Sequence, residues 1–302
     1  MTRRYDFEQV DVFTQQRFRG NPLAVFTDAT GLSKTHMQDI AREMNLSETT
    51  FVVPSERADC AARVYIFTPG MELPFAGHPT IGTAWVLARN GDLPKDANVV
   101  QLHENVGPIT LRLEGPTDDP SALFLTAPPP KFGSIVENRA AMAAALNIDT
   151  DELLPDAPMQ VVGVPVPFLY VMLRSSSGVD RVAVNGPALT KTISNPDLAG
   201  VFVFARQEQP NHVYSRMLGA EHVGVVEDPA TGSASGSLGA YLVQHGLVSG
   251  NGSIDVLSEQ GTKMGRQSFV SIRIERAGGQ VKRIEVGGSV VPVLRGSLEI
   301  DT

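Results

Sequence analysis

One segment of the chain is predicted to form a helix that protein surrounds on every side. Residues 72–91 read ELPFAGHPTIGTAWVLARNG, and Pro79 suits the first turn of a helix because that position needs no N–H partner. From Ile81 to Ala88 the helix has almost no polar face, whereas a helix on the surface keeps one. We therefore expect a fold in which other elements enclose this helix.

A second segment repeats the pattern 155 positions later. Residues 227–246 read EDPATGSASGSLGAYLVQHG, and five of the twenty aligned positions are identical, where composition alone gives about one or two. The identical pairs are Glu72/Glu227, Pro74/Pro229, Gly77/Gly232, Leu87/Leu242 and Gly91/Gly246. These matches fit an internal duplication, and they fit equally well two unrelated helices that begin at glycine.

The length of 302 residues allows about two domains. The densest proline cluster, Pro128-Pro129-Pro130, predicts a boundary near the middle of the chain, with an N-terminal half of residues 1–127 and a C-terminal half of residues 128–289. If the halves are duplicates, the helix starts at Gly77-His78 and Gly232-Ser233 face one cleft. Helix N-termini attract anions, so this arrangement predicts a small acidic substrate.

Charge and cysteine content exclude several classes of protein. The formal net charge of −8 has the wrong sign for a protein that binds nucleic acid or an anionic membrane. The N-terminal sequence carries Asp6, Glu8 and Asp11 where a signal peptide needs an apolar core, and no apolar stretch is long enough to cross a bilayer, so we expect a cytoplasmic protein. Cys60 is the single cysteine, which excludes internal disulfides and thiolate metal clusters.

A shorter amphipathic helix precedes the first candidate site residue. Ser33 suits the N-cap, and apolar residues recur at helical spacing up to Asn45, which suits the helix end. The following residues, 46–53, predict a strand, with Glu48 just before it.

Several common chemistries lack their motifs. GxGxxG, GxxxxGK[ST] and HExxH do not occur, and in the near-match to a nucleophile elbow, GSASG, Ala234 takes the place of the nucleophile. The six histidines are scattered singly, without a spacing typical of metal sites, so we expect no metal. What remains is a set of polar residues beside turns: Ser47, Glu48, His78, Asp228 and Ser233. Each of them taken alone is more often structural than catalytic.

Taken together, these residues lie in motifs that resemble the PhzF-like family, named for phenazine biosynthesis. The motifs are NLSETTFV (45–52), FTPGMELPFAGHPTIGTA (67–84), VVEDPATGSASG (225–236) and EQGTKMGR (259–266), and FRGNPLAVF (18–26) agrees as well. They occur in family order and spacing from about residue 7 to residue 300. Four motifs in combination are far more specific than any one of them.

The resemblance implies an α+β fold of the diaminopimelate-epimerase type, with two pseudo-symmetric domains. Each domain wraps a mostly antiparallel sheet or barrel round a central helix, and the last strand, about residues 290–302, is expected to return to the first domain. Epimerases of this fold carry a cysteine at the start of each central helix. Here Ala76 and Thr231 occupy those places, so the two-thiol mechanism is excluded.

The resemblance also implies an isomerase that needs no cofactor and in which Glu48 carries the proton. We expect a dry pocket and nearby Asp228 to raise the pKa of Glu48 toward the range that is useful near neutral pH. His78 and Asp228 are expected to hold the amino and hydroxyl groups of the substrate. Ser47 and Ser233, with the backbone N–H groups at Gly77 and Gly232, are expected to bind its carboxylate.

The expected substrate is a small cyclic or amino-acid-like carboxylate, with trans-2,3-dihydro-3-hydroxyanthranilate as the leading candidate. Two alternatives stay open: the same chemistry on a different small carboxylate, and a protein of this fold that binds a metabolite without turnover. The family also implies a homodimer. Glu48, His78 and Asp228 together favour an enzyme, because a protein that only binds has no need of a base.

Overall fold

The computed structural model describes residues 2–163, 166–193, 195–220, 226–248, 250, 252–277 and 280–301. Val225, the first residue of the motif that contains Asp228, lies outside the described residues. The chain divides into two compact units: unit 1 is Met1–Thr126 with Gly287–Thr302, and unit 2 is Ala127–Val286.

Unit 1 is a mostly antiparallel sheet with two helices. Its elements are β1 (Thr2–Val12), β2 (Asn21–Phe26), α1 (Lys34–Met44), β3 (Glu48–Val53), β4 (Ala62–Phe67), β5 (Glu72–Leu73), α2 (Gly77–Asn90), β6 (Val99–Glu104), β7 (Gly107–Glu114), β8 (Ala122–Thr126) and β18 (Val290–Asp301). The strands pair in the order β18-β1-β2-β3-β4-β6-β7-β8, and only β2–β3 and β4–β6 are parallel among the pairs described.

Unit 2 has the same connectivity. Its elements are β9 (Lys131–Ile135), α3 (Arg139–Leu146), β10 (Gln160–Gly163), β11 (Phe168–Met172), α4 (Ser176–Arg181), α5 (Gly186–Thr192), β12 (Gly200–Arg206), β13 (His212–Gly219), β14 (Glu227–Asp228), α6 (Gly232–Gln244), β15 (Ser253–Gln260) and β16 (Ser268–Ala277), and β17 (Gln280–Gly288) follows. Short 3-10 turns cover Thr150–Glu152 and Thr262–Met264. In the order β10-β11-β12-β13-β15-β16, the parallel pairs are the second and the fourth, β11–β12 and β13–β15, just as β2–β3 and β4–β6 are when unit 1 is counted from β1.

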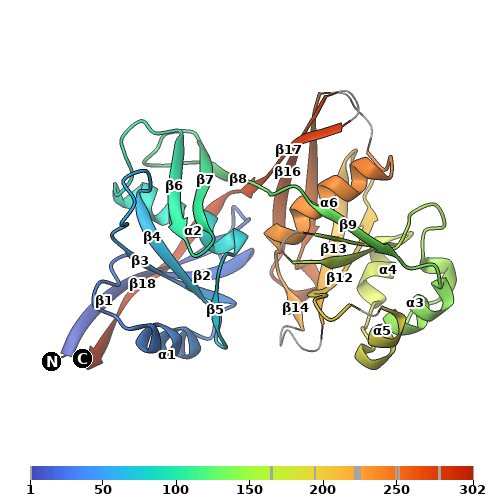
Figure 1. Ribbon diagram of the computed structural model, residues 1–302, viewed down its shortest axis with the longest axis horizontal. Helices are drawn as coiled ribbons and strands as arrows, with labels where there is room; N and C mark the ends of the chain where they lie inside the picture. Colours follow the sequence, from blue (N-terminus) through green and yellow to red (C-terminus); the bar gives the residue numbers. More distant parts are fainter. Residues whose placement is uncertain are drawn as a thin grey trace. The chain divides into compact units, whose positions relative to one another are not determined.

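Each unit encloses one helix, as the sequence predicts. Strands from both ends of the sheet in unit 1 contact α2, namely β1, β2 and β3 from one end and β8 from the other, so the sheet curves round this helix (Figure 1). Residues Gly77 to Ala88 are all buried. In unit 2, α6 contacts β10, β11 and β16 in the same way. The predicted fold class, α+β with two similar halves built round central helices, is confirmed.

Small residues let the strands approach the enclosed helices. A Cβ at Gly82 of α2 would lie 2.6 Å from Cδ2 of Leu23, and one at Gly239 of α6 would lie 2.7 Å from Cγ2 of Ile272. The hydroxyl groups that α2 buries find partners, since the Thr83 hydroxyl lies 2.8 Å from that of Thr50 on β3 and the Thr80 hydroxyl lies 2.6 Å from the carbonyl oxygen of Ala76. A wholly enclosed helix is therefore stable here because its apolar surface is covered and its hydroxyl groups are hydrogen-bonded.

The outer face of each sheet is covered by the remaining helices. Helix α1 begins after Ser33, whose Oγ accepts from the N–H of His36, and ends at Asn45, as the sequence predicts. In unit 2, α3, α4 and α5 pack on the face opposite α6. The side chains of β11 alternate between these two faces: Leu169 and Val171 join the hydrophobic cluster beneath α3, α4 and α5, whereas the Tyr170 hydroxyl donates to the carbonyl of Ala234 in α6. Among the described residues, every helix is too short or too polar to span a membrane.

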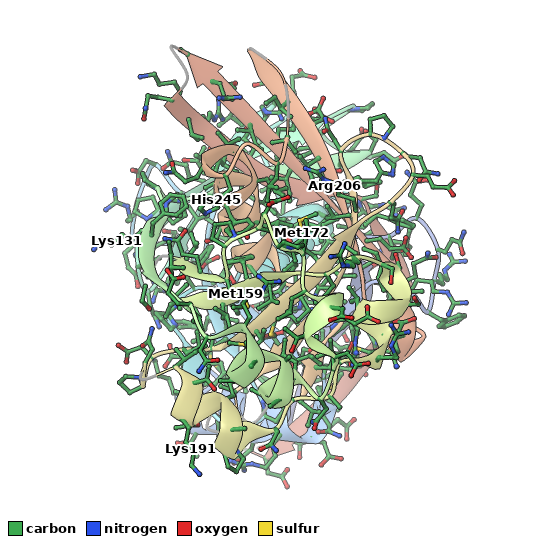
Figure 2. All side chains as sticks on the ribbon, turned by 90° about the vertical axis from the view of Figure 1, so that its right-hand side faces the viewer. Lys131, Met159, Met172, Lys191, Arg206 and His245 are labelled. Carbon is green, nitrogen blue, oxygen red and sulfur yellow. The ribbon has the colours of Figure 1, made fainter. Side chains whose placement is uncertain are left out.

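Figure 2 shows the core of unit 2 from the side. Met159 and Met172, both 3% exposed, lie toward the middle of this view, whereas Lys131 and Lys191 lie at its margin (Figure 2).

Candidate active site

Glu48 is the first residue of β3, and the end of α1 places it there. Asn45 adopts the left-handed conformation, with φ of 50°, that ends a helix and turns the chain back. Ser47 and Glu48 follow this turn, and Glu48 pairs with Leu23 of β2 in the parallel register. The Glu48 side chain is 16% exposed, so its carboxyl group is largely removed from water.

His78, in the first turn of α2, faces the Glu48 carboxyl group. Its Nε2 lies 3.2 Å from Oε2 of Glu48, and its side chain is 6% exposed. On the other side of the ring, Nδ1 lies 3.3 Å from the amide nitrogen of Asn21. Two predicted site residues are thus brought into contact, and Asn21 supports the ring from β2.

Burial keeps the imidazole ring of His78 neutral. Desolvation lowers its pKa from 6.5 to about 3, and the backbone carbonyl of Pro22 opposes this shift only in part. The uncharged ring therefore lies with Nε2 3.2 Å from Oε2 of Glu48.

The start of α2 is open. Its N-cap residue, Ala76, has no side chain that can cap the helix, and Pro79 has no N–H. The N–H groups of Gly77 and His78 therefore point out of the helix end without a side-chain cap. An open helix start of this kind favours a carboxylate or another anion.

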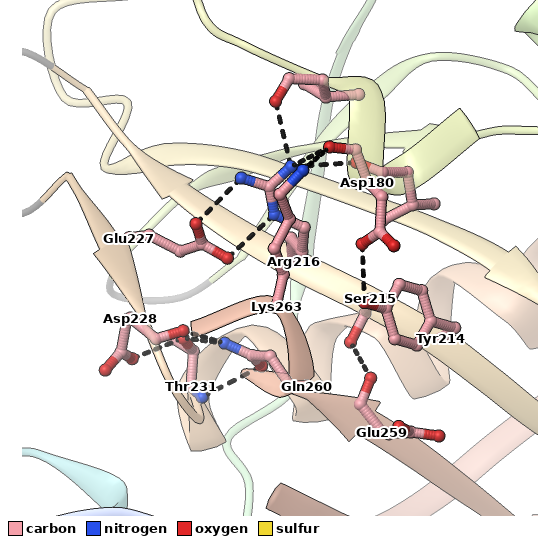
Figure 3. Close-up of polar contacts among 12 residues, drawn as sticks. Asp180, Tyr214, Ser215, Arg216, Glu227, Asp228, Thr231, Glu259, Gln260 and Lys263 are labelled. Atoms are coloured by element: carbon pink, nitrogen blue, oxygen red, sulfur yellow. Dashed lines mark hydrogen bonds and ion pairs between the residues drawn. The ribbon is translucent and has the colours of Figure 1, made fainter. Parts of the chain in front are cut away.

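In unit 2, Asp228 stands in an equivalent turn before α6. The Thr231 hydroxyl donates to Oδ2 of Asp228 at 2.5 Å, and Gln260 donates from Nε2 to the Thr231 hydroxyl at 3.0 Å and to the backbone carbonyl of Asp228 at 2.8 Å. The N–H of Thr231 donates in turn to Oε1 of Gln260 at 3.2 Å. Figure 3 shows these contacts, in which one buried amide side chain holds the turn that carries Asp228.

This arrangement leaves the start of α6 open as well. Thr231 is the N-cap residue, and a threonine at this position commonly accepts from the helix N–H groups. Here it makes no such bond, because its hydroxyl is turned toward Asp228 and Gln260. Gly232, which is buried, and Ser233, which is half-buried, begin this uncapped helix.

A buried ion pair fixes the strand that carries Asp228. Arg216 on β13 donates from Nε and Nη2 to the two carboxylate oxygens of Glu227, each at 2.8 Å, and the two side chains are 7% and 13% exposed. Its Nη1 also donates to the backbone carbonyls of Val179 and Val182 (Figure 3). A bidentate pair of this kind has little freedom, so Glu227 anchors β14 on one side while Asp228 lies on the other.

The structure thus places the predicted site residues in two groups. Ser47, Glu48, Gly77 and His78 lie together in unit 1, and Asp228, Gly232 and Ser233 lie together in unit 2. Ala76 and Thr231, which are expected at the starts of the two central helices, are the N-cap residues of α2 and α6. Within the part of the chain that the structure describes, no cluster of three or more His, Cys, Asp or Glu side chains is arranged to hold a metal ion.

Sequence reasoning missed the supporting residues Asn21, Thr231 and Gln260. Asn21 lies in the motif GNP and Gln260 in the motif EQG. A single sequence does not indicate which other residues these two side chains will contact. Their partners are 57 and 29 positions away along the chain, so only folding joins them.

The chain matches a known protein family over most of its length. The family model described as phenazine biosynthesis-like protein matches residues 10–296. Among curated proteins, the chain is 36% identical over 294 residues to trans-2,3-dihydro-3-hydroxyanthranilate isomerase of Pseudomonas chlororaphis, covering 96% of this chain and 97% of that protein.

Solved structures agree in fold. The PhzF-family phenazine biosynthesis protein of Bacillus anthracis superposes with a TM-score of 0.89 at 23% identity, covering 99% of this chain and 100% of that one. A hydroxyproline epimerase from Agrobacterium vitis reaches a TM-score of 0.64 at 13% identity, covering 99% and 94%.

Proposed function

Because the chain belongs to the phenazine biosynthesis-like (PhzF) family of isomerases, we propose that it moves a proton on a small cyclic or amino-acid-like carboxylate, with Glu48 as the proton carrier and without a cofactor. One observation carries this proposal. The Glu48 carboxyl group lies 3.2 Å from a buried, neutral imidazole, that of His78, at the open start of α2.

This pair has the parts that a proton transfer needs. As a carboxylate, Glu48 takes a proton from the hydroxyl-bearing ring carbon, and the electron pair left behind is delocalised over the conjugated system of the substrate. Glu48 then returns the proton to another carbon of that system. No atom is gained or lost and nothing is oxidised, so the step is complete with one acid-base group.

His78 and Asp228 are proposed to orient the substrate. Nε2 of His78 lies 3.2 Å from Oε2 of Glu48, so a substrate amino or hydroxyl group beside the carboxyl group is within reach of both side chains. Asp228 is held by Thr231 and Gln260 in one orientation, which is what a group that recognises a substrate amine or hydroxyl requires.

The carboxylate of the substrate is proposed to bind at the uncapped helix starts. Ser47, Ser233 and the N–H groups at Gly77 and Gly232 supply donors for it, and both helices present the positive end of the dipole. Replacement of Asp228 or Ser233 by alanine is expected to weaken saturable substrate binding. Unchanged binding in both variants would remove these two residues from the substrate site.

The leading candidate substrate is trans-2,3-dihydro-3-hydroxyanthranilate, which the name of the 36% identical relative from Pseudomonas chlororaphis supports. The test mixes purified protein with this compound in D₂O and follows substrate loss by absorbance and deuterium incorporation by mass spectrometry. The wild type is expected to convert it and to place deuterium on carbon, and Glu48→Gln is expected to lower the rate by about 10²- to 10⁴-fold, the usual contribution of a general base.

A matched control is Glu43→Gln, since Glu43 is an exposed carboxylate at the end of α1. It should react at the wild-type rate. Turnover retained in Glu48→Gln would refute Glu48 as the carrier. If the wild type consumes nothing, the named substrate is wrong, and deuterium exchange into a panel of other small unsaturated amino acids decides between a different substrate and a protein that only binds.

A homodimer and a cytoplasmic location are the remaining proposals, and both derive from the family and sequence expectations above. Light scattering after size exclusion tests the first, with twice the chain mass of 32.4 kDa as the expected result. Fractionation of the producing cells tests the second.

A further inference from the structure

Glu104 is a buried acidic residue to which the proposed mechanism gives no task. It is the last residue of β6 and is 1% exposed. Its Oε1 lies 2.5 Å from the hydroxyl oxygen of Thr80, in the first turn of α2 two residues after His78. Glu104 thus lies behind the helix start that carries Gly77 and His78.

The hydrogen bonds around Thr80 require two protons. The Thr80 hydroxyl oxygen lies 2.6 Å from the backbone carbonyl oxygen of Ala76 and 2.5 Å from Oε1 of Glu104. A hydroxyl group has one hydrogen, and a backbone carbonyl has none to give. If Thr80 donates to Ala76, the second contact is a hydrogen bond only when Glu104 is a carboxylic acid that donates to Thr80.

The surroundings of Glu104 agree with a neutral acid. Oε2 of Glu104 is buried without a hydrogen-bond partner among the described residues, which is far costlier for a carboxylate than for the carbonyl oxygen of an acid. Burial raises the pKa of Glu104 to about 8, while the Thr80 hydroxyl and the charge of Arg63 act in the opposite direction. Three elements face Glu104. Strand β4 contributes the charged side chain of Arg63, α2 contributes the Thr80 hydroxyl, and β7 contributes Gly107, which pairs with Glu104 through the backbone.

Unit 2 holds a neutral donor at the equivalent place. Strand β15 corresponds to β6, because β15 is parallel to β13 as β6 is parallel to β4, each of these partners being the second strand before the central helix. Strand β15 ends in Gln260 as β6 ends in Glu104. The Ser235 hydroxyl donates to the carbonyl of Thr231 at 2.9 Å, as Thr80 does to Ala76, and Nε2 of Gln260 donates to the Thr231 hydroxyl. An amide keeps its hydrogens at every pH, whereas Glu104 has one to give only when it is protonated.

We propose that Glu104, as a neutral carboxylic acid, is a positioning residue for the start of α2, and that its ionisation at alkaline pH releases this turn and switches off the site there. An ionised Glu104 can only accept, so the Thr80 hydroxyl donates to Glu104 and its hydrogen bond to the Ala76 carbonyl breaks. Ala76 is the N-cap of α2, the helix whose first turn carries His78. The proposal rests on the proposed function only in that this helix start belongs to the active site.

The first test titrates Glu104 directly and needs no substrate. In protein labelled with ¹³C at glutamate carboxyl carbons, the Glu104→Gln variant identifies the Glu104 signal by its loss. This signal is expected to change near pH 8, and a change near the ordinary value of 4.5 would overturn the proposal. Because it reads only the carboxyl group, this outcome is independent of whether the protein turns over any particular carboxylate.

The second test compares pH profiles of kcat with the substrate that the enzyme turns over. In wild type, kcat is expected to fall about tenfold for each pH unit above the Glu104 pKa, because a single ionisation removes the active form. Glu104→Gln keeps a hydrogen-bond donor at every pH and should not show this alkaline fall in kcat. Glu104→Leu, which fills space without donating, should be impaired at every pH. The same alkaline limb in wild type and in Glu104→Gln would overturn the proposal.

The third test reads folding in place of activity. The midpoint of urea unfolding of wild type is expected to fall as pH rises from 4.5 to about 8, because between these values the folded protein holds a proton that the unfolded chain has lost, and Glu104→Gln should lack this fall. Gln260→Glu is the matched control, because it puts a titratable acid at the equivalent position of unit 2 and should steepen the fall. Equal slopes in wild type and Glu104→Gln would overturn the proposal.

Discussion

At the scale of single residues, the site depends on a histidine that stays neutral because it has almost no water around it. His78 is 6% exposed, and its neighbours are Asn21, the backbone of Pro22 and Glu48. An imidazolium ion in this place would form a fixed ion pair with Glu48. A neutral ring forms no such ion pair, so the carboxyl group of Glu48 stays free to gain and lose a proton.

Because His78 is neutral in the folded protein, the free energy of unfolding depends on pH in the acidic range. With a pKa of 6.5 in the unfolded chain and about 3 in the folded protein, His78 binds a proton only on unfolding between these two values. Stability is therefore gained as pH rises through this window and lost as pH falls, by up to about 1.4 kcal/mol per pH unit from this group. Chemical denaturation of wild type and His78→Gln between pH 3 and 7 should give a shallower slope for the variant, and parallel slopes would contradict the assignment.

At the scale of elements, both central helices begin without a side-chain cap, for two different reasons. The side chain of Ala76 has no polar atom, and the hydroxyl of Thr231 is hydrogen-bonded to Asp228 and Gln260. A helix start normally gains about 1 kcal/mol from a capping side chain. Both units forgo it at the same position, which leaves N–H groups available to a ligand anion.

The hydroxyl of Thr231 is expected to contribute to folding and, through Asp228, to substrate binding. Thr231→Val keeps the shape of the side chain but removes the hydrogen that Asp228 accepts at 2.5 Å, and it also leaves Nε2 of Gln260 with one acceptor fewer. We expect a loss of about 1 to 3 kcal/mol in unfolding free energy and a rise in KM larger than the fall in kcat. Thr231→Ser should restore both quantities, and a variant with unchanged KM would show that this bond does not orient Asp228.

At the scale of the whole molecule, the chain begins and ends in the same unit. Strand β18, the last element, pairs with β1 along its whole length, from Thr2–Asp301 to Val12–Val290 (Figure 1). This pairing also places Nη2 of Arg295 3.0 Å from Oε2 of Glu8, whose side chain is 6% exposed. Unit 1 is therefore complete only when the final strand has returned to it.

Removal of residues 290–302 is accordingly expected to unfold unit 1. The truncation bares one edge of β1 and strips the buried Glu8 carboxylate of its cation. Amide hydrogen exchange should show lost protection in β1 to β3 while β10 to β13 of unit 2 stay protected. Removal of residues 301–302 alone is the control, because Asp301 and its partner Thr2 are exposed, and it should be tolerated. Full protection after the longer truncation would contradict the expectation.

The sequence by itself determined the elements whose cause is local. The apolar run of α2 predicts an enclosed helix whatever surrounds it, and Ser33 and Asn45 bound α1 through bonds to residues three and four positions away. The spacing of the motifs also identifies the family, and with it the fold class, because those patterns are written along one chain.

Only the tertiary structure decided what the polar residues of the site meet. The neutrality of His78 follows from burial by β2 and β3, the diversion of the Thr231 hydroxyl follows from Gln260 on β15, and the proton on Glu104 follows from the meeting of β6 with α2. Each of these is an electrostatic property set by neighbours 24 to 57 positions distant in sequence. Desolvation and hydrogen-bond partners exist only once the chain has folded, which is why no pattern in the sequence could reveal them.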